Sequence, residues 1–240
     1  HYPVYMGLSF SNKDRLKDIS TRWYQSGAYP VQSLNYTYNE LTSAEKDALI
    51  LTDVNWTLFG SYLLQYGKGL FDDKKVILSG LILPSFSMNR LTEELGIPEF
   101  NEIKKRIEHI AKYTNRPIYI SVSTNEAVKD LLKDHLYTEG LLMRYSAKPY
   151  DNLAIMRRNY ENTYLLDYLY ESFYPETLTN VCLDLKGVKM LSIYYVPAFK
   201  SLLQFYKESG DVTHYDKLHA LLESIIKKAD YYNEEVRERY

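Results

Sequence analysis

The sequence has almost no cysteine, since Cys182 is the only one among 240 residues. A single thiol excludes an internal disulfide and any cysteine-rich zinc site. Long apolar runs are missing as well, because the longest, Val76 to Phe86, is too short to span a bilayer and contains a proline. These absences predict a chain that is soluble as given and that folds around an ordinary hydrophobic core.

A strong excess of charge is also absent. The formal net charge is -2, whereas a nucleic-acid-binding protein usually carries a strongly basic face, so we expect no nucleic-acid partner. The chain begins at His1 without an initiator methionine or a signal peptide. We therefore expect a processed or excised fragment, in which membrane attachment depends on a segment absent from this chain.

Signatures of catalysis and of cofactor binding are missing too. The string GKG at 67–69 lacks the spacing of a phosphate-binding loop, and neither G-x-G-x-x-G nor G-x-S-x-G occurs. His214 and His219 are five residues apart and fall on different helix faces. Cys182 lies between apolar residues, which predicts a buried, inert thiol. The sequence thus predicts no cofactor, no metal and no catalytic residue.

What is present is an alternation of short apolar segments with helical patterns over residues 1–149. The segment Ala48 to Thr52 is apolar without alternation, as in strands buried on both faces of a parallel sheet. The alternation indicates βαβ units and predicts an α/β fold with a mostly parallel, Rossmann-like sheet covered by helices on both faces. Expected strands are 48–52, 74–83, 116–123 and 139–147; expected helices are 11–27, 58–66, 87–96, 97–115 and 126–135.

After Pro149 the pattern becomes purely helical, which places a domain boundary between 149 and 150. Expected helices are 151–174, 188–211 and 212–240, with Pro197 kinking or breaking the second. The turn SGD at 209–211 joins two amphipathic helices as an antiparallel hairpin, as in a helical-repeat unit. Residues 150–240 are therefore predicted to form an all-α, tetratricopeptide-like tail.

Polar residues follow the predicted strands, where ligands bind in open α/β sheets. Together they would line one cleft, but turns and helix caps also prefer Asp and Asn, so a plain strand-to-helix bend is the alternative. The polar residues are Asp53 and Asn55 after the first strand, Ser79 and Ser85 after the second, and Ser123, Thr124 and Asn125 after the third.

Tyrosine is unusually frequent, with 25 residues against 8 Phe and 2 Trp. Tyr160, Tyr164 and Tyr168 recur every four residues, so we expect them on one helical face. Such rings either pack between helices or form an aromatic groove for a peptide or glycan, and the pattern leaves both interpretations open.

Three strings resemble the C-terminal soluble region of the bacterial multi-pass membrane protein O-mannosyltransferase-like family, long catalogued as a domain of unknown function. They lie within YNELTSAEKDALILTDVNWTLFGSYLLQY and RPIYISVS…LKDHLYTEGLLMRYSAKP, and the LLQFYKESGDVTHYDKLHALLESI hairpin is similar to the family's repeat helices. Val54 and Trp56 stand where the family has acidic residues. The resemblance assigns the family's transferase chemistry to its membrane-embedded half, which these strings do not cover, so no catalytic residue is transferred. The matching positions are Asn55, Thr57 and Tyr62, then Pro117, Ile118 and Tyr119, then Glu139, Gly140, Leu141 and Arg144.

The resemblance implies a non-catalytic module on the periplasmic or extracytoplasmic face of a bacterial membrane, which binds a protein or glycan acceptor. Two alternatives are a stand-alone hydrolase or transferase that uses the cleft at the strand ends, and a scaffold whose tyrosine-rich helices mediate oligomerisation. The predicted ligand-binding residues are Asp53, Asn55, Thr57, Tyr62, Ser123, Asn125, Glu139 and Arg144.

Overall fold

The computed structural model describes residues 12–53, 55–79, 92–93, 95–98, 105–170 and 191–230. Cys182, Ser85, Val54 and most of the predicted helix 87–96 lie outside these ranges, as does the second half of the strand predicted at 74–83.

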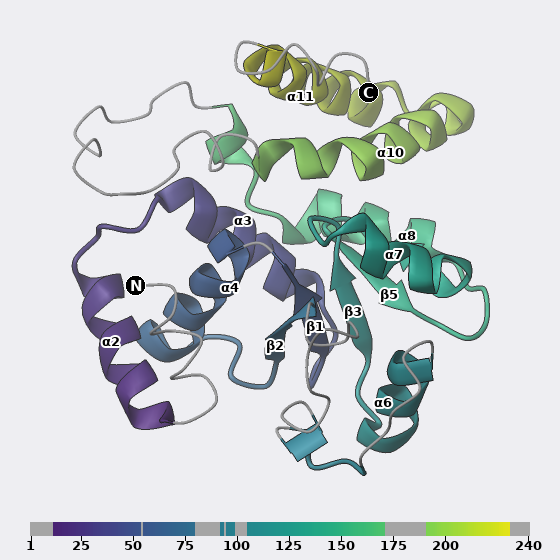
Figure 1. The fold of residues 1–240 in the computed structure, drawn as a ribbon. Coiled ribbons are helices and arrows are strands. Elements are labelled where there is room, and N and C mark those ends of the chain that lie inside the picture. Colours follow the sequence, from purple (N-terminus) through teal and green to yellow (C-terminus); the bar gives the residue numbers. More distant parts are fainter. Residues whose placement is uncertain are drawn as a thin grey trace.

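Helices and short strands alternate in the first part of the chain, and helices alone follow (Figure 1). The α-helices are α2 (Lys13–Gln25), α3 (Val31–Ser43), α4 (Asn55–Tyr62), α6 (Arg106–Thr114), α7 (Glu126–Leu132), α8 (Asn152–Arg158), α10 (Val196–Ser209) and α11 (Val212–Asp230). The strands are β1 (Leu49–Thr52), β2 (Lys75–Leu78), β3 (Ile118–Ser121), β4 (Leu136–Thr138) and β5 (Leu142–Tyr145). Short π or 3-10 segments are η1 (Leu63–Gly67), η4 (Lys133–His135), η5 (Asn159–Thr163), η6 (Asp167–Leu169) and η8 (Leu191–Tyr195).

The described strands form a mixed sheet in the order β2-β1-β3-β5-β4. Strand β1 pairs in parallel with β2 and β3, and Ile50 lies opposite Val76 on one side and Tyr119 on the other. Strands β5 and β4 run antiparallel to their neighbours. The predicted parallel pairing is therefore found only among β2, β1 and β3 of the described strands.

A tight hairpin explains the antiparallel edge. The segment predicted as one strand at 139–147 begins with a three-residue turn, Glu139 to Leu141, and β4 precedes it. Two strands joined by so short a turn can only pair antiparallel. Gly140 makes the turn possible, because its φ of 126° is a conformation that side-chain-bearing residues rarely adopt.

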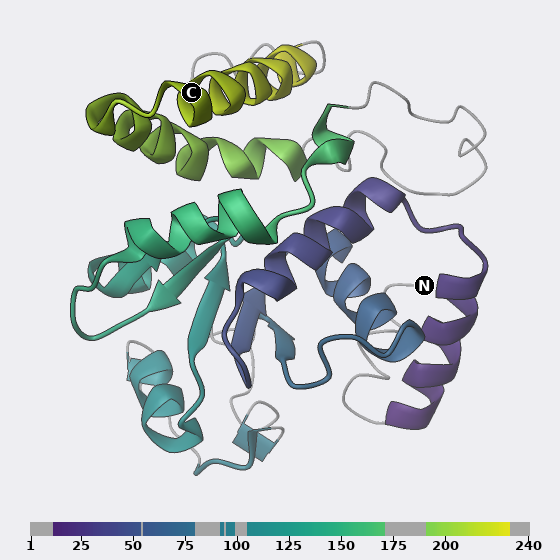
Figure 2. The same ribbon diagram turned by 180° about the vertical axis from the view of Figure 1, so that it is seen from behind.

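The two faces of the sheet carry separate hydrophobic clusters. On one face Leu49, Leu51 and Ile120 pack against Ile110 of α6 and Val128 of α7. On the other face the opposite residues of the same strands, such as Ile50 and Tyr119, pack with α2, α3, α4 and η1, and Figure 2 shows α3 crossing this side. The prediction of an α/β sheet with helices on both faces is confirmed by this arrangement.

Helix α3 lies in a segment for which the sequence predicted no element. It is rich in Ser, Asn, Thr and Tyr, which favour helices only weakly. Many of its polar residues are buried, so no charged outer face marks it as amphipathic. Tertiary burial stabilises this helix in place of intrinsic propensity.

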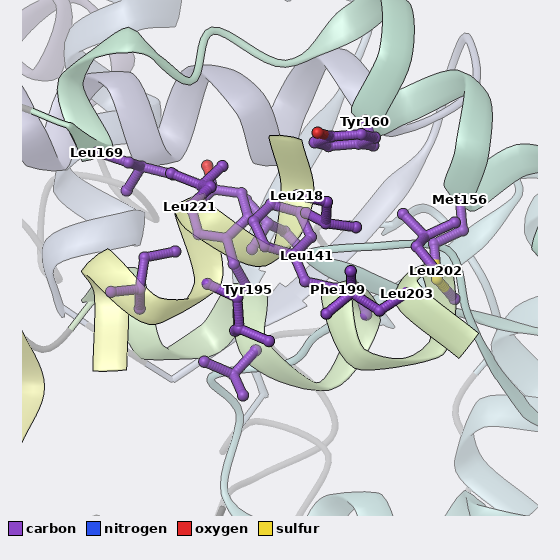
Figure 3. Close-up of a cluster of buried hydrophobic side chains, with 14 of the residues drawn as sticks. Leu141, Met156, Tyr160, Leu169, Tyr195, Phe199, Leu202, Leu203, Leu218 and Leu221 are labelled. Atoms are coloured by element: carbon purple, nitrogen blue, oxygen red, sulfur yellow. The ribbon is translucent and has the colours of Figure 1, made fainter. Parts of the chain in front are cut away.

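The helical end of the chain packs on α3 and on the hairpin. Its largest cluster of buried side chains joins Tyr36 and Leu141 to α8, α10 and α11 (Figure 3). Helices α10 and α11 form the predicted antiparallel pair, and Gly210 with a φ of 73° closes α10. Pro197 stands in the first turn of α10, where its missing N–H is tolerated, so the helix predicted at 188–211 begins at Val196.

The single helix predicted at 151–174 is wrong. Helix α8 passes into η5, and the chain becomes extended at Tyr164, with ψ at 136°. A side-chain fork from α3 competes with the helix there, because Asn39 accepts a hydrogen bond from the Leu165 N–H (2.8 Å) and donates to the Leu165 carbonyl (2.9 Å). Tyr160, Tyr164 and Tyr168 therefore do not share one helical face.

The buried tyrosines support the packing interpretation. Tyr36, Tyr195 and Tyr206 are at most 1% exposed. The ring centroids of Tyr36 and Tyr195 lie 5.8 Å apart, and those of Tyr195 and Phe199 lie 5.2 Å apart. The Tyr195 hydroxyl accepts a hydrogen bond from Asn39 (2.7 Å), which satisfies its polar end.

Candidate functional site

The predicted cleft residues after β1 and β3 lie together, but they bond mainly to one another. The Asp53 Oδ2 accepts a 2.6 Å hydrogen bond from the Asn125 N–H. The Asn125 side chain in turn accepts from the Ala127 N–H (2.7 Å) and caps α7. Asp53 therefore links the end of β1 to the start of α7.

The hydroxyl groups at this edge are also paired. The Thr57 hydroxyl lies 2.6 Å from that of Thr52, and the Ser123 hydroxyl lies 2.7 Å from that of Ser121. Tyr62, 7% exposed, belongs to the hydrophobic cluster beneath α3. Asn55 begins α4. At this edge of the sheet the polar side chains thus bond mainly to one another. Tyr62 belongs to the hydrophobic core.

Partial burial raises the pKa of Asp53, and the Asn125 N–H and the charge of Lys129 act in the opposite direction. Lys129 itself binds Glu126 (2.5 Å) and donates to the Val122 carbonyl (3.2 Å). The Asp53 Oδ1 is buried without a hydrogen-bond partner within the described part of the chain. Asp53 is consequently a perturbed carboxyl at the end of a buried strand.

Sequence reasoning missed Glu40 because it missed α3. Glu40 is 1% exposed, and burial raises its pKa to about 8 although a hydrogen bond from Ser121 acts in the opposite direction. Its Oε1 has no hydrogen-bond partner among the described residues. The Ser121 hydroxyl, which lowers the pKa of Glu40, also lies 2.7 Å from the Ser123 hydroxyl, so these two serines form a hydroxyl pair next to a buried acid.

A second polar cluster surrounds Arg144, and we call it the Arg144 cluster: Arg144, Glu45, Glu139, Tyr119 and Tyr150. The Arg144 guanidinium pairs with both carboxylate oxygens of Glu45, with the Nη2 to Oε2 distance at 3.2 Å. It lies 5.9 Å from the Tyr119 ring centroid and 5.6 Å from that of Tyr150. Such a planar cation between rings and a carboxylate is rigidly held.

Glu139 and Arg144, both predicted from the resemblance, are brought together through Tyr150. The Tyr150 hydroxyl donates a 2.6 Å hydrogen bond to Glu139 Oε1. Burial raises the pKa of Glu139, whereas Tyr150 and the charge of Arg144 lower it. Burial also raises the pKa of Tyr119 and of Tyr150, so both phenols stay protonated and Tyr150 remains a donor.

An open groove of about 710 Å³ begins at the Arg144 cluster. Its walls are the last turn of α6, the start of β3 and the segment from the end of β5 to Tyr150, which lies at the amino-terminal ends of the parallel strands. Arg144 and Tyr150 belong to both the cluster and the groove. The volume falls in the range of small-molecule and cofactor sites.

The predicted site residues thus fall into two groups. Asp53, Thr57, Ser123 and Asn125 lie at the carboxyl ends of the parallel strands, and Glu139 and Arg144 belong to the Arg144 cluster. Sequence reasoning missed Glu45 and Tyr150, because the Glu45–Arg144 pair joins residues 99 positions apart and no local spacing signals it.

Comparison with protein-family models, with curated proteins and with solved structures finds no match to this chain. Within the described residues, no group of three or more His, Cys, Asp or Glu side chains has the geometry to hold a metal ion. No described helix combines the length and the apolar character required to cross a bilayer.

Proposed function

We propose that this chain is a binding module of a membrane glycosyltransferase-like protein, and that it holds a protein or glycan acceptor. The observation that carries the proposal is the groove beside the Arg144 cluster. A preformed cation stacked on aromatic rings at one end of an open groove is a typical element of ligand recognition. A hydrogen bond to Glu139 holds Tyr150, whose ring lies against the Arg144 guanidinium.

Three finer features belong to the same proposal. The parallel strands β2, β1 and β3 with helices on both faces support a Rossmann-like ancestry for the sheet. The α10–α11 hairpin supports a tetratricopeptide-like unit. A periplasmic or extracytoplasmic location rests on the family resemblance alone, and contact with the membrane would then come from a segment outside this chain.

Glycan and peptide arrays probed with the purified chain test this function. We expect selective binding, and we expect Arg144→Gln to weaken it while exposed Lys217→Gln on α11 leaves it unchanged. Far-ultraviolet circular dichroism checks that the Arg144 variant is folded. Absence of binding to every glycan and peptide would overturn the proposal.

A hydrolase or transferase is a second candidate, favoured by the paired hydroxyls of Ser123 and Ser121 next to the buried Glu40. Asp53, which follows β1, accepts a hydrogen bond from the N–H of Asn125, two residues after Ser123. A screen with chromogenic esters and glycosides tests it. Turnover that Ser123→Ala abolishes and that Thr124→Ser retains would favour this candidate over the binding module.

A further inference from the structure

The groove beside the Arg144 cluster is lined by cations and by no acidic side chain. Arg116, Arg144 and Lys148 contribute to its walls, and the lining contains neither Asp nor Glu. Side chains of one charge around a concave surface concentrate ions of the opposite charge. The groove is therefore suited to an anionic ligand.

Two of the three cations are available to such a ligand. Arg144 is neutralised by Glu45 and forms a fixed end wall. Arg116 donates to a backbone carbonyl, that of Asp47 (3.2 Å), and has no carboxylate partner among the described residues. The Lys148 ammonium likewise forms no ion pair within the described ranges, and Lys148 is exposed. Arg116 and Lys148 thus supply uncompensated positive charge.

The remaining walls indicate which kind of anion fits. Tyr145 and Tyr150 present amphipathic rings, and Pro117 and Pro149 add flat apolar surface. Two backbone groups of the groove already have partners, since the Leu49 N–H binds the Pro117 carbonyl (2.8 Å) and the Ser146 N–H binds the His135 carbonyl (2.8 Å). A peptide strand therefore cannot pair with these two backbone groups.

From these observations we propose that the groove binds an anionic saccharide, a sugar chain that carries carboxylate or phosphate groups. The sugar rings lie against Tyr145 and Tyr150, and Arg116 and Lys148 bind the anionic groups by charge-assisted hydrogen bonds. This inference rests on the proposed binding function and names the ligand class for it.

Isothermal titration of the whole chain with four probes tests the inference. The probes are a galacturonate octamer, mannose 6-phosphate, neutral maltooctaose and an eight-residue glutamate peptide. We expect the octamer or the sugar phosphate to bind, with an affinity that falls as salt is added. Maltooctaose and the peptide should bind at least about tenfold more weakly, since each charge-assisted contact is a large share of the affinity.

The double variant Arg116→Gln/Lys148→Gln removes the two available charges. We expect it to weaken binding of the anionic sugar at least about tenfold. Lys17→Gln/Lys217→Gln removes two exposed charges elsewhere on the surface and is expected to leave the affinity unchanged. Thermal unfolding of both variants verifies that they are folded.

The remaining outcomes overturn the inference. Equal or tighter binding of maltooctaose or of the glutamate peptide would leave the binding module intact but refute the ligand class. An equal loss of affinity in both double variants would show a general charge effect and no groove site. Absence of binding to all four probes would refute the anionic saccharide, whereas only failure on the wider arrays refutes the binding function itself.

Discussion

Glu40 and Glu139 are both enclosed, with exposed fractions of 1% and 2%, but their surroundings differ. Glu139 accepts a hydrogen bond from Tyr150 and lies in the field of Arg144. Glu40 lies on α3, where burial and the Ser121 hydroxyl influence its pKa and no cation among the described residues does so. The charged form of Glu139 is thus stabilised by a donor and a cation, whereas burial dominates at Glu40 and holds it neutral.

The pH dependence of stability separates the two acids most strongly. A folded-state pKa of about 8 for Glu40 exceeds the unfolded value of 4.5, so between these values the folded chain holds a proton that the unfolded chain has lost. Its contribution therefore lowers stability by about 1.4 kcal/mol per pH unit as the pH rises, or about 4 kcal/mol from pH 5 to 8. Glu40→Gln should remove this slope, measured by urea unfolding across that range.

Glu223→Gln is the matched control for Glu40→Gln. Glu223 is an exposed carboxyl on α11, so the same substitution there should leave the slope of the wild-type chain unchanged. A Glu40→Gln chain that still loses stability between pH 5 and 8 would show that another group causes the effect.

The position of Glu139 depends on the β4–β5 turn. Gly140→Ala, which should disturb this turn, is expected to have the second-largest effect on stability. A Cβ at this position would collide with the Tyr164 hydroxyl, which accepts the Leu141 N–H, and φ is 126°. Overpacking and backbone strain together should cost about 3 kcal/mol in free energy of unfolding.

Gly69→Ala separates backbone strain from collision. Gly69 also has a positive φ, 73°, but a Cβ there meets no atom within 4 Å. We expect this variant to lose only about 1 kcal/mol in the same urea titration. Equal losses at the two glycines would mean that contact with Tyr164 does not limit the turn.

The contrast between local and distant interactions explains which parts of the fold could be predicted from the sequence. Helix α2 and strand β1 follow from local pattern, and both are confirmed; the structure gives α2 an Asn12 cap. Helix α3 lacks such a pattern because its polar residues face the core. The end of the helix after Arg158 depends on Asn39, which is 126 positions from Leu165.

The candidate site divides in the same way. Asp53 and Asn125 follow from the rule that ligands bind beyond the carboxyl ends of strands in open α/β sheets, and the structure joins the two residues by a hydrogen bond. Glu139 and Arg144 came from a resemblance and not from their spacing. Glu40, Glu45 and Tyr150 were missed, since burial and pairing across the chain decide their importance.

Loss of the hydroxyl that supports Glu139 should have a smaller effect than the turn substitution. Tyr150→Phe keeps the ring beside Arg144 but removes the 2.6 Å hydrogen bond. A buried acceptor left without its donor should cost about 2 kcal/mol at pH 7, and the pKa of Glu139 should rise further. Urea unfolding and carbon-13 titration of the carboxyl measure the two effects.

Tyr113→Phe is the control for Tyr150→Phe. Tyr113 is 46% exposed, so loss of its hydroxyl should change stability by less than about 0.5 kcal/mol. A Tyr150→Phe chain as stable as this control would mean that the Tyr150 hydroxyl does not stabilise Glu139.

Asp53 is less buried than Glu40 or Glu139, so its substitution should have the smallest effect on stability. Asp53→Asn removes the charge but keeps a side-chain oxygen for the Asn125 N–H, so we expect a change below about 0.5 kcal/mol in free energy of unfolding at pH 7. Asp53→Ala removes the acceptor as well and should cost about 1.5 kcal/mol. If Asp53→Asn is as harmful as Asp53→Ala, the charge itself matters, and the strand end would then contain a functional carboxylate and not a structural tie.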